Sequence, residues 1–374
     1  MKPRTVMVVA GDPSGDALAA ALIRSLASRL DSPRFIGAGG PKMLEAGVEN
    51  SFDLTADAVI GLDMFKKLLH FRRRISELTQ LAAKQKPELI VLVDFQLFNA
   101  TLARSIRKAL GKAPKIVQFV SPQVWASRPG RAERMARTLD LLLCLFPFEK
   151  EWYAKRMPRF HVKWVGHPIM ERYSGGGREE GPDPTIVLLP GSRQGELKRH
   201  LPVVLEAAER IAAKQTVRFK LVATTEEMAA HARELAAKQA AKIEVQIGNL
   251  EEALSTATIA LAKTGTVTLE CAWFGVPTIA FYKTSALTYA IGRQIVSVKY
   301  LAMPNILAGK ELFPEFIQQN ATPENIAQAA LELLNYEPRR KEVRAALRNV
   351  ISTLGGPGAT ERAASAILAL KFEV

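Results

Sequence analysis

Short apolar runs rich in β-branched residues recur along this chain, and a helix-like segment such as 17–29 or 72–85 follows many of them. Runs that are apolar throughout are typical of strands buried on both faces of a sheet. Strands that alternate with helices predict an α/β fold with a doubly wound parallel sheet. In the first half, the predicted strands are Thr5–Ala10, Arg34–Gly37, Leu89–Val93, Lys115–Val120, Leu141–Leu145 and His161–Val165.

A polar segment divides the chain into two such patterns. Residues 174–184 read SGGGREEGPDP and predict a linker. We therefore expect one Rossmann-like domain over 1–173, a second over 185–340, and C-terminal helices over 341–374 that pack back across the cleft between them. Ligands of such sheets bind at the carboxyl ends of the strands. In the second half, the predicted strands are Thr185–Leu189, Phe219–Ala223, Ile243–Ile247, Ile259–Ala262 and Pro277–Phe281.

The charge balance is strongly basic. Lys and Arg total 51 against 37 Asp and Glu, a formal net charge of +14 over 374 residues. Such an excess indicates a polyanionic partner: nucleic acid, an anionic membrane or phosphorylated substrates. Charge alone does not choose among them, but the sequence has no RNA-binding or helix-turn-helix signature, so we expect no nucleic acid.

Three further features bear on the compartment. The longest strongly apolar run, Leu141–Phe148, is far shorter than the roughly 20 residues of a membrane-spanning helix. The N-terminal run stops at Gly11-Asp12-Pro13, which is not typical of a signal peptide. Cys144 and Cys271 lie in apolar stretches, so we expect buried reduced thiols in a cytosolic protein.

Two positions in the first half are candidates for chemistry. The first predicted strand ends in the loop GDPSGD, whose Ser14, Gly15 and Asp16 open a helix. Free amides at a helix start can hold an anion, but a plain turn with Ser14 or Asp16 as the N-cap fits equally well. The strand Leu89–Val93 ends at Asp94, where a general base would stand or where a helix N-cap would be needed.

The second half offers three more loops. Gly191, Ser192 and Arg193 form a turn that suits a diphosphate, because small residues admit it and the guanidinium binds two oxygens. Thr264, Gly265 and Thr266 open another helix, in which Glu270 either accepts hydrogen bonds from ribose hydroxyls or belongs to a capping box. The segment 304–311 carries Asn305, Lys310 and Glu311. The sequence has no H-E-x-x-H, Cys/His cluster or D-x-D motif, so we expect neither a metal nor a cofactor.

These motifs together resemble the lipid-A-disaccharide synthase family. The resemblance runs in order along nearly the whole chain. It rests on GDPSGD at 11–16, GAGGPKM at 37–43, VSPQVWA at 120–126, FPFE at 146–149, GHP at 166–168, LLPGSR at 188–193, the segment 265–270 and MPNILAGKEL at 303–312.

The resemblance implies a GT-B glycosyltransferase that inverts the sugar carbon without a metal. The implied reaction moves 2,3-diacylglucosamine from UDP-2,3-diacylglucosamine to 2,3-diacylglucosamine 1-phosphate (lipid X), which gives a β-1,6-linked disaccharide 1-phosphate and UDP. Asp94 matches the aspartate proposed as the base. Ser192, Arg193, Thr264, Thr266 and Glu270 match the nucleotide side. The implied substrate cleft takes Ser14, Gly15, Asp16, Asn99, Ser121, Asn305 and Glu311.

Two departures keep alternatives open. The family usually has Glu-Ala in the first loop, where this chain has Asp12-Pro13, and a second aspartate where this chain has Leu97. The chain is then a lipid-A-disaccharide synthase, a divergent homologue of low activity, or another GT-B enzyme such as a different UDP-sugar transferase or a UDP-N-acetylglucosamine epimerase. A basic protein that binds anionic lipid or nucleic acid is the non-enzymatic alternative, and a homodimer is left open.

The segment Leu62–Ala82 predicts one helix with two apolar faces. Leu68, Phe71, Ile75, Leu78 and Ala82 form a core stripe. Leu62, Phe65 and Leu69 form a second patch, bordered by Lys66, Arg72 and Arg73. Apolar side chains rimmed by cations are typical of helices that lie among anionic headgroups. With acylated substrates, we expect reversible binding to the cytoplasmic face of the inner membrane; the alternative is an extended core face with solvated charges.

Overall fold

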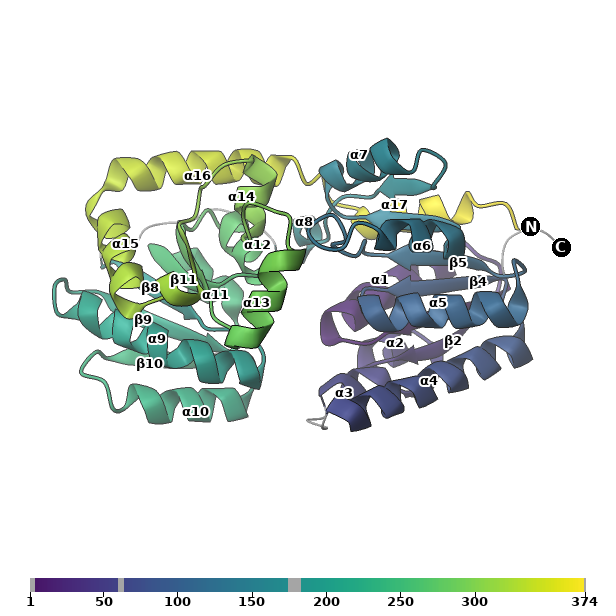
Figure 1. Cartoon of the computed structure of the whole chain (residues 1–374), viewed down its shortest axis with the longest axis horizontal. Helices are drawn as coiled ribbons and strands as arrows, with labels where there is room; N and C mark the ends of the chain where they lie inside the picture. The colour runs from purple at the N-terminus through teal and green to yellow at the C-terminus, as the bar shows by residue number, and fades with distance from the viewer. Residues whose placement is uncertain (1–3, 60–63, 174–182, 373–374) are drawn as a thin grey trace. The chain divides into compact units, whose positions relative to one another are not determined.

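The computed structural model describes residues 4–59, 64–173 and 183–372, which form two compact units (Figure 1). The first unit holds Met1–Glu171 together with Leu354–Val374, and the second holds Arg172–Thr353. Most of the predicted linker lies outside the described residues. The C-terminal helix α17 (Ala359–Leu368) belongs to the first unit, where it packs on α1 (Pro13–Ala27).

The first unit is built on a parallel sheet of the order β3-β2-β1-β4-β5-β6-β7. Every strand predicted in this half is confirmed to within two residues. The edge strand β3 was not predicted, because polar residues interrupt its sequence VENSFD and only Val48 is buried. The strands are β1 (Thr5–Ala10), β2 (Arg34–Gly39), β3 (Val48–Asp53), β4 (Leu89–Val93), β5 (Lys115–Phe119), β6 (Leu141–Cys144) and β7 (Val162–Trp164).

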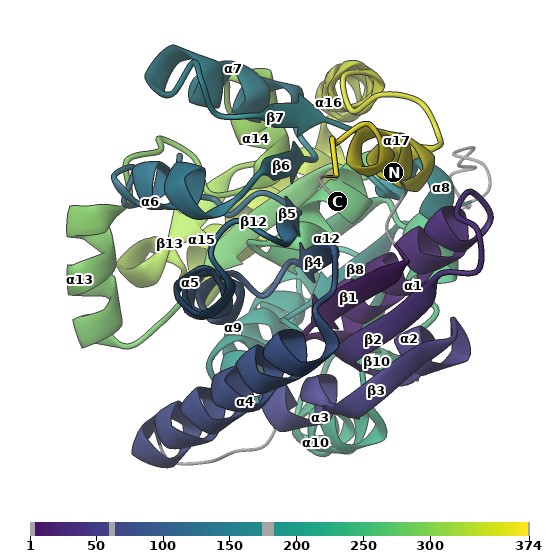
Figure 2. The same cartoon turned by 90° about the vertical axis from the view of Figure 1, so that its right-hand side faces the viewer.

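Helices cover both faces of this sheet (Figure 2). On one face α4 (Met64–Gln85) lies beside α5 (Gln96–Leu110), and their apolar stripes meet Met7 and Val9 of β1. Figure 2 shows α1 and α17 on the opposite face. The other helices of this unit are α2 (Pro41–Glu45), α3 (Leu54–Val59), α6 (Arg131–Thr138), α7 (Pro147–Arg156) and the short α8 (Ile169–Arg172).

The second unit is built on a parallel sheet of the order β10-β9-β8-β11-β12-β13. Successive residues of β8 alternate between two apolar cores: Ile186 packs with α9, α10 and α15, and Val187 packs with α11, α12 and α16. Burial on both faces explains the continuous apolar runs of the sequence. The strands are β8 (Thr185–Leu189), β9 (Arg218–Ala223), β10 (Ile243–Ile247), β11 (Ile259–Lys263), β12 (Thr278–Tyr282) and β13 (Glu315–Ile317).

Proline lies in the first turn of two helices in this unit, where its missing N–H is tolerated. Pro323 is the first residue of α15 (Pro323–Asn335), and Pro338 is the second of α16 (Glu337–Ser352). The short strand β13 was not predicted. The remaining helices are α9 (Gln194–Ala212), α10 (Glu226–Ala236), α11 (Leu250–Thr256), α12 (Thr266–Trp273), α13 (Ala286–Ile295) and α14 (Met303–Ala308).

Cys144 and Cys271 are buried free thiols, and burial raises the pKa of both. Within the described ranges, no helix is both long and apolar enough to cross a membrane.

Candidate active site

Asp94 stands directly after β4, at the carboxyl edge of the first sheet. Asp94 and Phe95 both adopt left-handed backbone conformations, with φ of 49° and 38°. Such conformations cost free energy in non-glycine residues and persist only where their surroundings enforce them. The turn is fixed to the neighbouring strand, because the Asp94 amide donates to the Phe119 carbonyl at 2.9 Å.

Two buried amide side chains hold the same turn from below. Asn99 Nδ2 donates to the Asp94 carbonyl at 2.8 Å and to the Val93 carbonyl at 3.2 Å. Gln118 Nε2 donates to the Asp94 carbonyl at 3.0 Å. Asn99 was predicted for the substrate cleft, and here it positions Asp94; Gln118 was not predicted. These hydrogen bonds fix the backbone of Asp94, whose half-buried side chain stands at the carboxyl end of β4.

The Phe95 ring completes this support. Its centroid lies 5.7 Å from that of Phe71 on α4 and 5.2 Å from that of Phe98 on α5. A Cβ atom added to Gly11 would lie 2.1 Å from Phe95 Cδ1, so only glycine fits at that position. The first loop therefore packs against the Asp94 turn, and a Cβ on Gly15 would lie 3.6 Å from the Asp94 Cβ.

The first loop is capped differently from the prediction. Asp12 is the N-cap of α1 and accepts a hydrogen bond from the Gly15 amide at 2.7 Å, so the expectation of Ser14 or Asp16 as the cap was wrong. Ser14 is exposed beside it. Asp16 is buried, and its carboxylate accepts from the amides of Gly40, Lys42 and Met43 at 2.8–3.1 Å. Asp16 thus holds the 37–43 motif in place.

Ser121 belongs to a buried polar cluster that follows β5. Its Oγ lies 3.1 Å from the Tyr153 hydroxyl. In the same cluster Glu149 accepts from Trp125 Nε1 at 2.9 Å and from the Phe146 amide at 3.0 Å. Burial raises the pKa of Glu149 from its ordinary 4.5 to about 7, and these donors oppose the rise. The cluster joins the VSPQVWA and FPFE motifs into one structural unit.

In the second unit, the loop after β8 meets the loop after β11. Lys263 Nζ lies 3.0 Å from Glu196 Oε1, and both side chains are more than four-fifths buried. Burial favours the neutral carboxyl of Glu196, but the Lys263 ammonium outweighs this and lowers its pKa. Neither residue was predicted to have a role in the site. Gly191, with φ of 129°, passes so close that a Cβ there would lie 2.8 Å from Glu196 Oε2.

The predicted diphosphate loop is open above this ion pair. Ser192 and Arg193 are exposed at the N-terminus of the 19-residue helix α9. The Arg193 side chain is 80% exposed and lies 3.5 Å from Glu196 Oε1, so its guanidinium is available to a ligand. An anion at this helix start would meet backbone N–H groups and two cations, Arg193 and Lys263.

His200 ties the loop after β8 to the end of β12. It is buried, its Nδ1 lies 2.8 Å from the Pro190 carbonyl, and its Nε2 accepts from the Lys283 amide at 3.0 Å. Nε2 also lies 3.0 Å from the Lys283 carbonyl; with the proton on Nδ1, the neutral ring donates to Pro190 and accepts from the Lys283 amide. Burial accordingly lowers the pKa of His200. No sequence motif indicated this residue.

The helix α12 carries the remaining nucleotide-side predictions. Thr264 is buried before the helix, Gly265 is its N-cap with φ of 147°, and Thr266 is exposed as its first residue. Glu270 is the fifth residue of α12, and its Oε1 accepts from Arg172 and from the Tyr173 hydroxyl, both at 2.7 Å. The capping-box interpretation was therefore wrong, because the carboxylate binds side chains instead of helix amides.

Asn305 and Glu311 differ in accessibility. Asn305 is fully buried; its Nδ2 donates to the Phe313 carbonyl and to Glu315 at 2.8 Å, and its Oδ1 accepts from the amides of Leu312 and Phe313. With both ends of the amide engaged, Asn305 positions its loop, whereas Glu311 is exposed on it.

On α4 the core stripe is confirmed at Ile75, Leu78 and Ala82, which are buried. Leu69, from the second patch, is 65% exposed, and Arg72 and Arg73 are exposed with it. Arg73 pairs with Glu77 at 2.9 Å. Leu62 and the side chains of Phe65 and Lys66 lie outside the part of the chain that the structure describes.

Across the described ranges, no group of three His, Cys, Asp or Glu side chains is arranged to hold a metal ion. Instead, the polar groups collect at the carboxyl ends of β4 in the first unit and of β8 and β11 in the second. The model of the family described as lipid-A-disaccharide synthetase matches residues 6–370. The chain belongs to this family.

Individual members of the lipid-A-disaccharide synthetase family match this chain over nearly their full length. The lipid-A-disaccharide synthases of Anaeromyxobacter dehalogenans strain 2CP-C and of Syntrophus aciditrophicus are both 37% identical, over 97% and 99% of this chain and 96% and 98% of their own. That of Geobacter sulfurreducens is 35% identical over 97% of this chain and 96% of its own.

Solved structures extend the likeness in fold. The UDP complex of Staphylococcus aureus MnaA has a TM-score of 0.65 at 13% identity, covering 96% of this chain and 94% of its own. Acinetobacter baumannii MurG has a TM-score of 0.60 at 15% identity, covering 98% of this chain and all of its own. The GT-B fold with two parallel-sheet domains, as the sequence predicted, is confirmed for this member of the family.

Proposed function

We propose that this chain is an inverting glycosyltransferase that forms the lipid A disaccharide. It transfers 2,3-diacylglucosamine from its UDP derivative to 2,3-diacylglucosamine 1-phosphate (lipid X), with release of UDP. The observation that carries the proposal is the family match over residues 6–370. It is supported by a constrained carboxylate at one sheet edge and by a cationic loop pair at another.

Asp94 is the proposed general base. Inversion at the sugar carbon requires that the acceptor hydroxyl lose its proton as it attacks. Asn99, Gln118 and the Phe95 ring fix the backbone that carries this carboxylate at the carboxyl end of β4, which supports its role as a positioned base. Such fixation preserves the geometry that makes proton transfer efficient.

The leaving diphosphate is the proposed ligand of the second unit. Negative charge grows on UDP as the glycosidic bond breaks, and fixed cations and N–H donors lower the barrier most when they need no rearrangement. Arg193 and Ser192 stand exposed at the start of α9, and Lys263 lies below them against Glu196. We propose that Gly191, Thr264, Gly265 and Thr266 admit the diphosphate and that Glu270 binds the ribose, with no metal required.

One assay tests the reaction. UDP release is measured from UDP-2,3-diacylglucosamine with and without lipid X, and again in excess EDTA. We expect release that depends on lipid X and is unchanged by EDTA. Release without an acceptor, or with a non-lipid acceptor only, would favour a different GT-B enzyme. No release at all under any of these conditions would favour a divergent homologue, in which Leu97 stands where the family has an aspartate.

We also propose that α4 binds the cytoplasmic face of the inner membrane. The support is the exposed Leu69 beside Arg72 and Arg73, since both substrates are acylated and reside in a bilayer. In flotation with phosphatidylglycerol vesicles at low salt, the wild type should float and the Phe65→Ser/Leu69→Ser variant should not. Equal flotation of the two would reject the helix as the contact. A homodimer is tested separately by sedimentation in detergent.

A further inference from the structure

A small groove opens between α5 and α6, next to the Asp94 turn. Its volume is about 210 Å³. One wall is the α5 stripe that contains Leu97, Ala100 and Arg104, and the other is the α6 stripe that contains Arg131, Arg134 and Met135. Asn99 and Gln118, the two amides that hold Asp94, also line it. The groove therefore adjoins the proposed base.

Three arginines line this groove, Arg104, Arg131 and Arg134, and Arg128 is a fourth arginine near Arg131. Burial lowers the pKa of Arg131, and the positive charges of Arg128, Arg134 and Arg104 lower it further. Within the described residues, no carboxylate forms an ion pair with any of the four. The acidic residue of α6, Glu133, is exposed two residues from Arg131 and does not line the groove. An unneutralised cation cluster beside a pocket is typical of an anion site.

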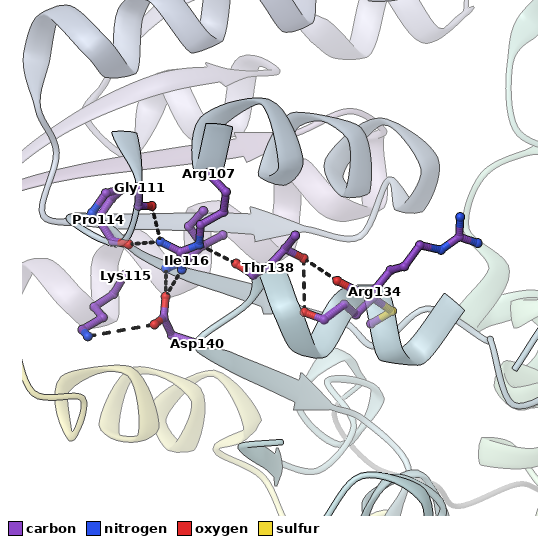
Figure 3. A network of polar contacts seen from close by, with 9 residues as sticks. Arg107, Gly111, Pro114, Lys115, Ile116, Arg134, Thr138 and Asp140 are labelled. Carbon is purple, nitrogen blue, oxygen red and sulfur yellow. Dashed lines mark hydrogen bonds and ion pairs between the residues drawn. The ribbon is translucent and has the colours of Figure 1, made fainter. Parts of the chain in front are cut away.

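The walls of the groove are held at a fixed spacing. Arg107 of α5 donates to the Thr138 carbonyl at the end of α6 at 2.8 Å and to the Pro114 carbonyl at 2.8 Å, and it pairs with Asp140 (Figure 3). Asp140 in turn accepts from the Ile116 amide of β5 at 2.7 Å. Figure 3 shows the Arg134 side chain extending away from this network. Arg107 is thus structural, whereas Arg134 is left for another partner.

The Arg104 guanidinium lies toward the Asp94 end of the groove. Arg104 Nε donates to the Ala100 carbonyl at 3.1 Å and its Nη2 to Thr101 Oγ1 at 3.2 Å, so the side chain folds back toward the start of α5. Ala100 lies four residues after the start of α5, about 6 Å along its axis. That separation is comparable with the width of one sugar ring. At the floor, Asn99 Oδ1 is buried without a hydrogen-bond partner among the described residues.

We propose that this groove binds the phosphate of the acceptor, with Arg104, Arg131 and Arg134 as its ligands and with Arg128 adding charge. The proposal rests on the proposed function, since a sugar held between these arginines and Asp94 would present its hydroxyl to the base and its phosphomonoester to the cluster. The volume is below the roughly 300–1,000 Å³ of pockets that enclose a drug-sized ligand, so the groove takes one end of the acceptor and leaves the acyl chains outside.

The test compares two acceptors in neutral detergent micelles: lipid X and the same diacylglucosamine without its 1-phosphate. For Arg131→Gln and Arg134→Gln, we expect the KM for lipid X to rise roughly 10- to 100-fold, as expected for a lost charge-assisted contact. The KM for the donor and all constants for the dephosphorylated acceptor should stay at wild-type values. Arg131→Lys should recover part of the loss. The matched control is Arg137→Gln, the same change on α6 at an exposed position outside the groove.

The outcomes separate the alternatives. Equal losses on both acceptors, or no loss on lipid X, would overturn the proposal. A loss that appears only when phosphatidylglycerol is added to the micelles would also overturn it, because the arginines would then bind a phospholipid headgroup. Equilibrium binding of lipid X without donor, to wild type and to Arg131→Gln, gives a readout that needs no turnover. If the wild type releases no UDP, the proposed function fails, and this binding ratio still decides on the groove.

Discussion

Replacing Gly11 by alanine should disable the enzyme by moving Asp94, although Gly11 itself touches no substrate in our proposal. An added Cβ would lie 2.1 Å from Phe95 Cδ1 and 2.4 Å from two further ring atoms. Carbon atoms in contact lie about 3.5–4.0 Å apart, so the ring has to move by roughly 1.5 Å. Because Phe71 and Phe98 hold the ring on other sides, much of that movement passes to the Phe95 backbone, which adjoins Asp94.

The magnitudes follow from this displacement. Overpacking of a tight contact costs about 1–3 kcal/mol of unfolding free energy. A misplacement of about 1 Å at a reacting group costs about 10²-fold in rate. We therefore expect Gly11→Ala to lower kcat for UDP release about 100-fold at saturating substrates. Its affinity for UDP should change less than about twofold, since the proposed diphosphate loops lie in the other unit.

A second substitution tests whether the contact between Gly11 and Phe95 positions Asp94. Phe95→Ala removes the obstructing ring, so the double variant Gly11→Ala/Phe95→Ala should be more active than Gly11→Ala alone. The control is Gly130→Ala, because an added Cβ at Gly130 meets nothing within 4 Å and its φ of −63° suits alanine. Wild-type kcat in Gly11→Ala, or a double variant no better than the single one, would show that this contact does not position the base.

Further predictions concern single residues of the proposed site. Asp94→Asn should lower turnover about 10²- to 10⁴-fold with unchanged thermal unfolding, and near-normal turnover would remove Asp94 from the role of base. Arg193→Ala should weaken UDP binding by about 1.5–3 kcal/mol in calorimetry; unchanged affinity would place the side chain outside the diphosphate site. Glu270→Gln should weaken UDP binding with little change in the melting temperature. A lower melting temperature with little change in UDP affinity would indicate a purely structural carboxylate. Glu149→Gln should make the unfolding free energy less dependent on pH. Between pH 4.5 and about 7, Glu149 keeps a proton in the folded state that it has lost in the unfolded state, so rising pH destabilises the wild type. From pH 5 to pH 8 the wild type should lose about 2–3 kcal/mol of unfolding free energy relative to this variant in urea titrations, and parallel curves would contradict the raised pKa.

Much of the fold was predictable because each buried strand of a parallel sheet has a recognisable local sequence pattern. Each buried strand is a short apolar run, and each run ends where a loop can carry a functional side chain. Asp94 and the loop at Gly191–Arg193 were found in this way. The edge strand β3 was not predicted because one of its edges and alternate side chains face solvent, so its sequence has no continuous apolar run.

The contacts that hold the site were not predictable, because they join residues far apart in sequence. Lys263 contacts Glu196, and His200 contacts Lys283, because neighbouring strands bring these residues together. No local sequence pattern indicates either contact. The cap of α1 is a different case. Asp12, Ser14 and Asp16 are all good N-cap residues, but Pro13 favours the first helical position, which makes Asp12 the cap. That signal was present in the sequence.

The position of α17 has a consequence for how the chain is made. The first unit is completed by a segment that is synthesised after the whole second unit: α17 packs on α1, and Arg362 donates to the Val165 carbonyl at 2.7 Å. The whole of Arg172–Thr353 emerges from the ribosome in between. At about 5–20 residues per second, the face of α1 that α17 later covers waits roughly 15–70 s for its partner. During that interval the first unit has all seven of its strands but not α17, so its packing is completed only after the whole second unit has been synthesised.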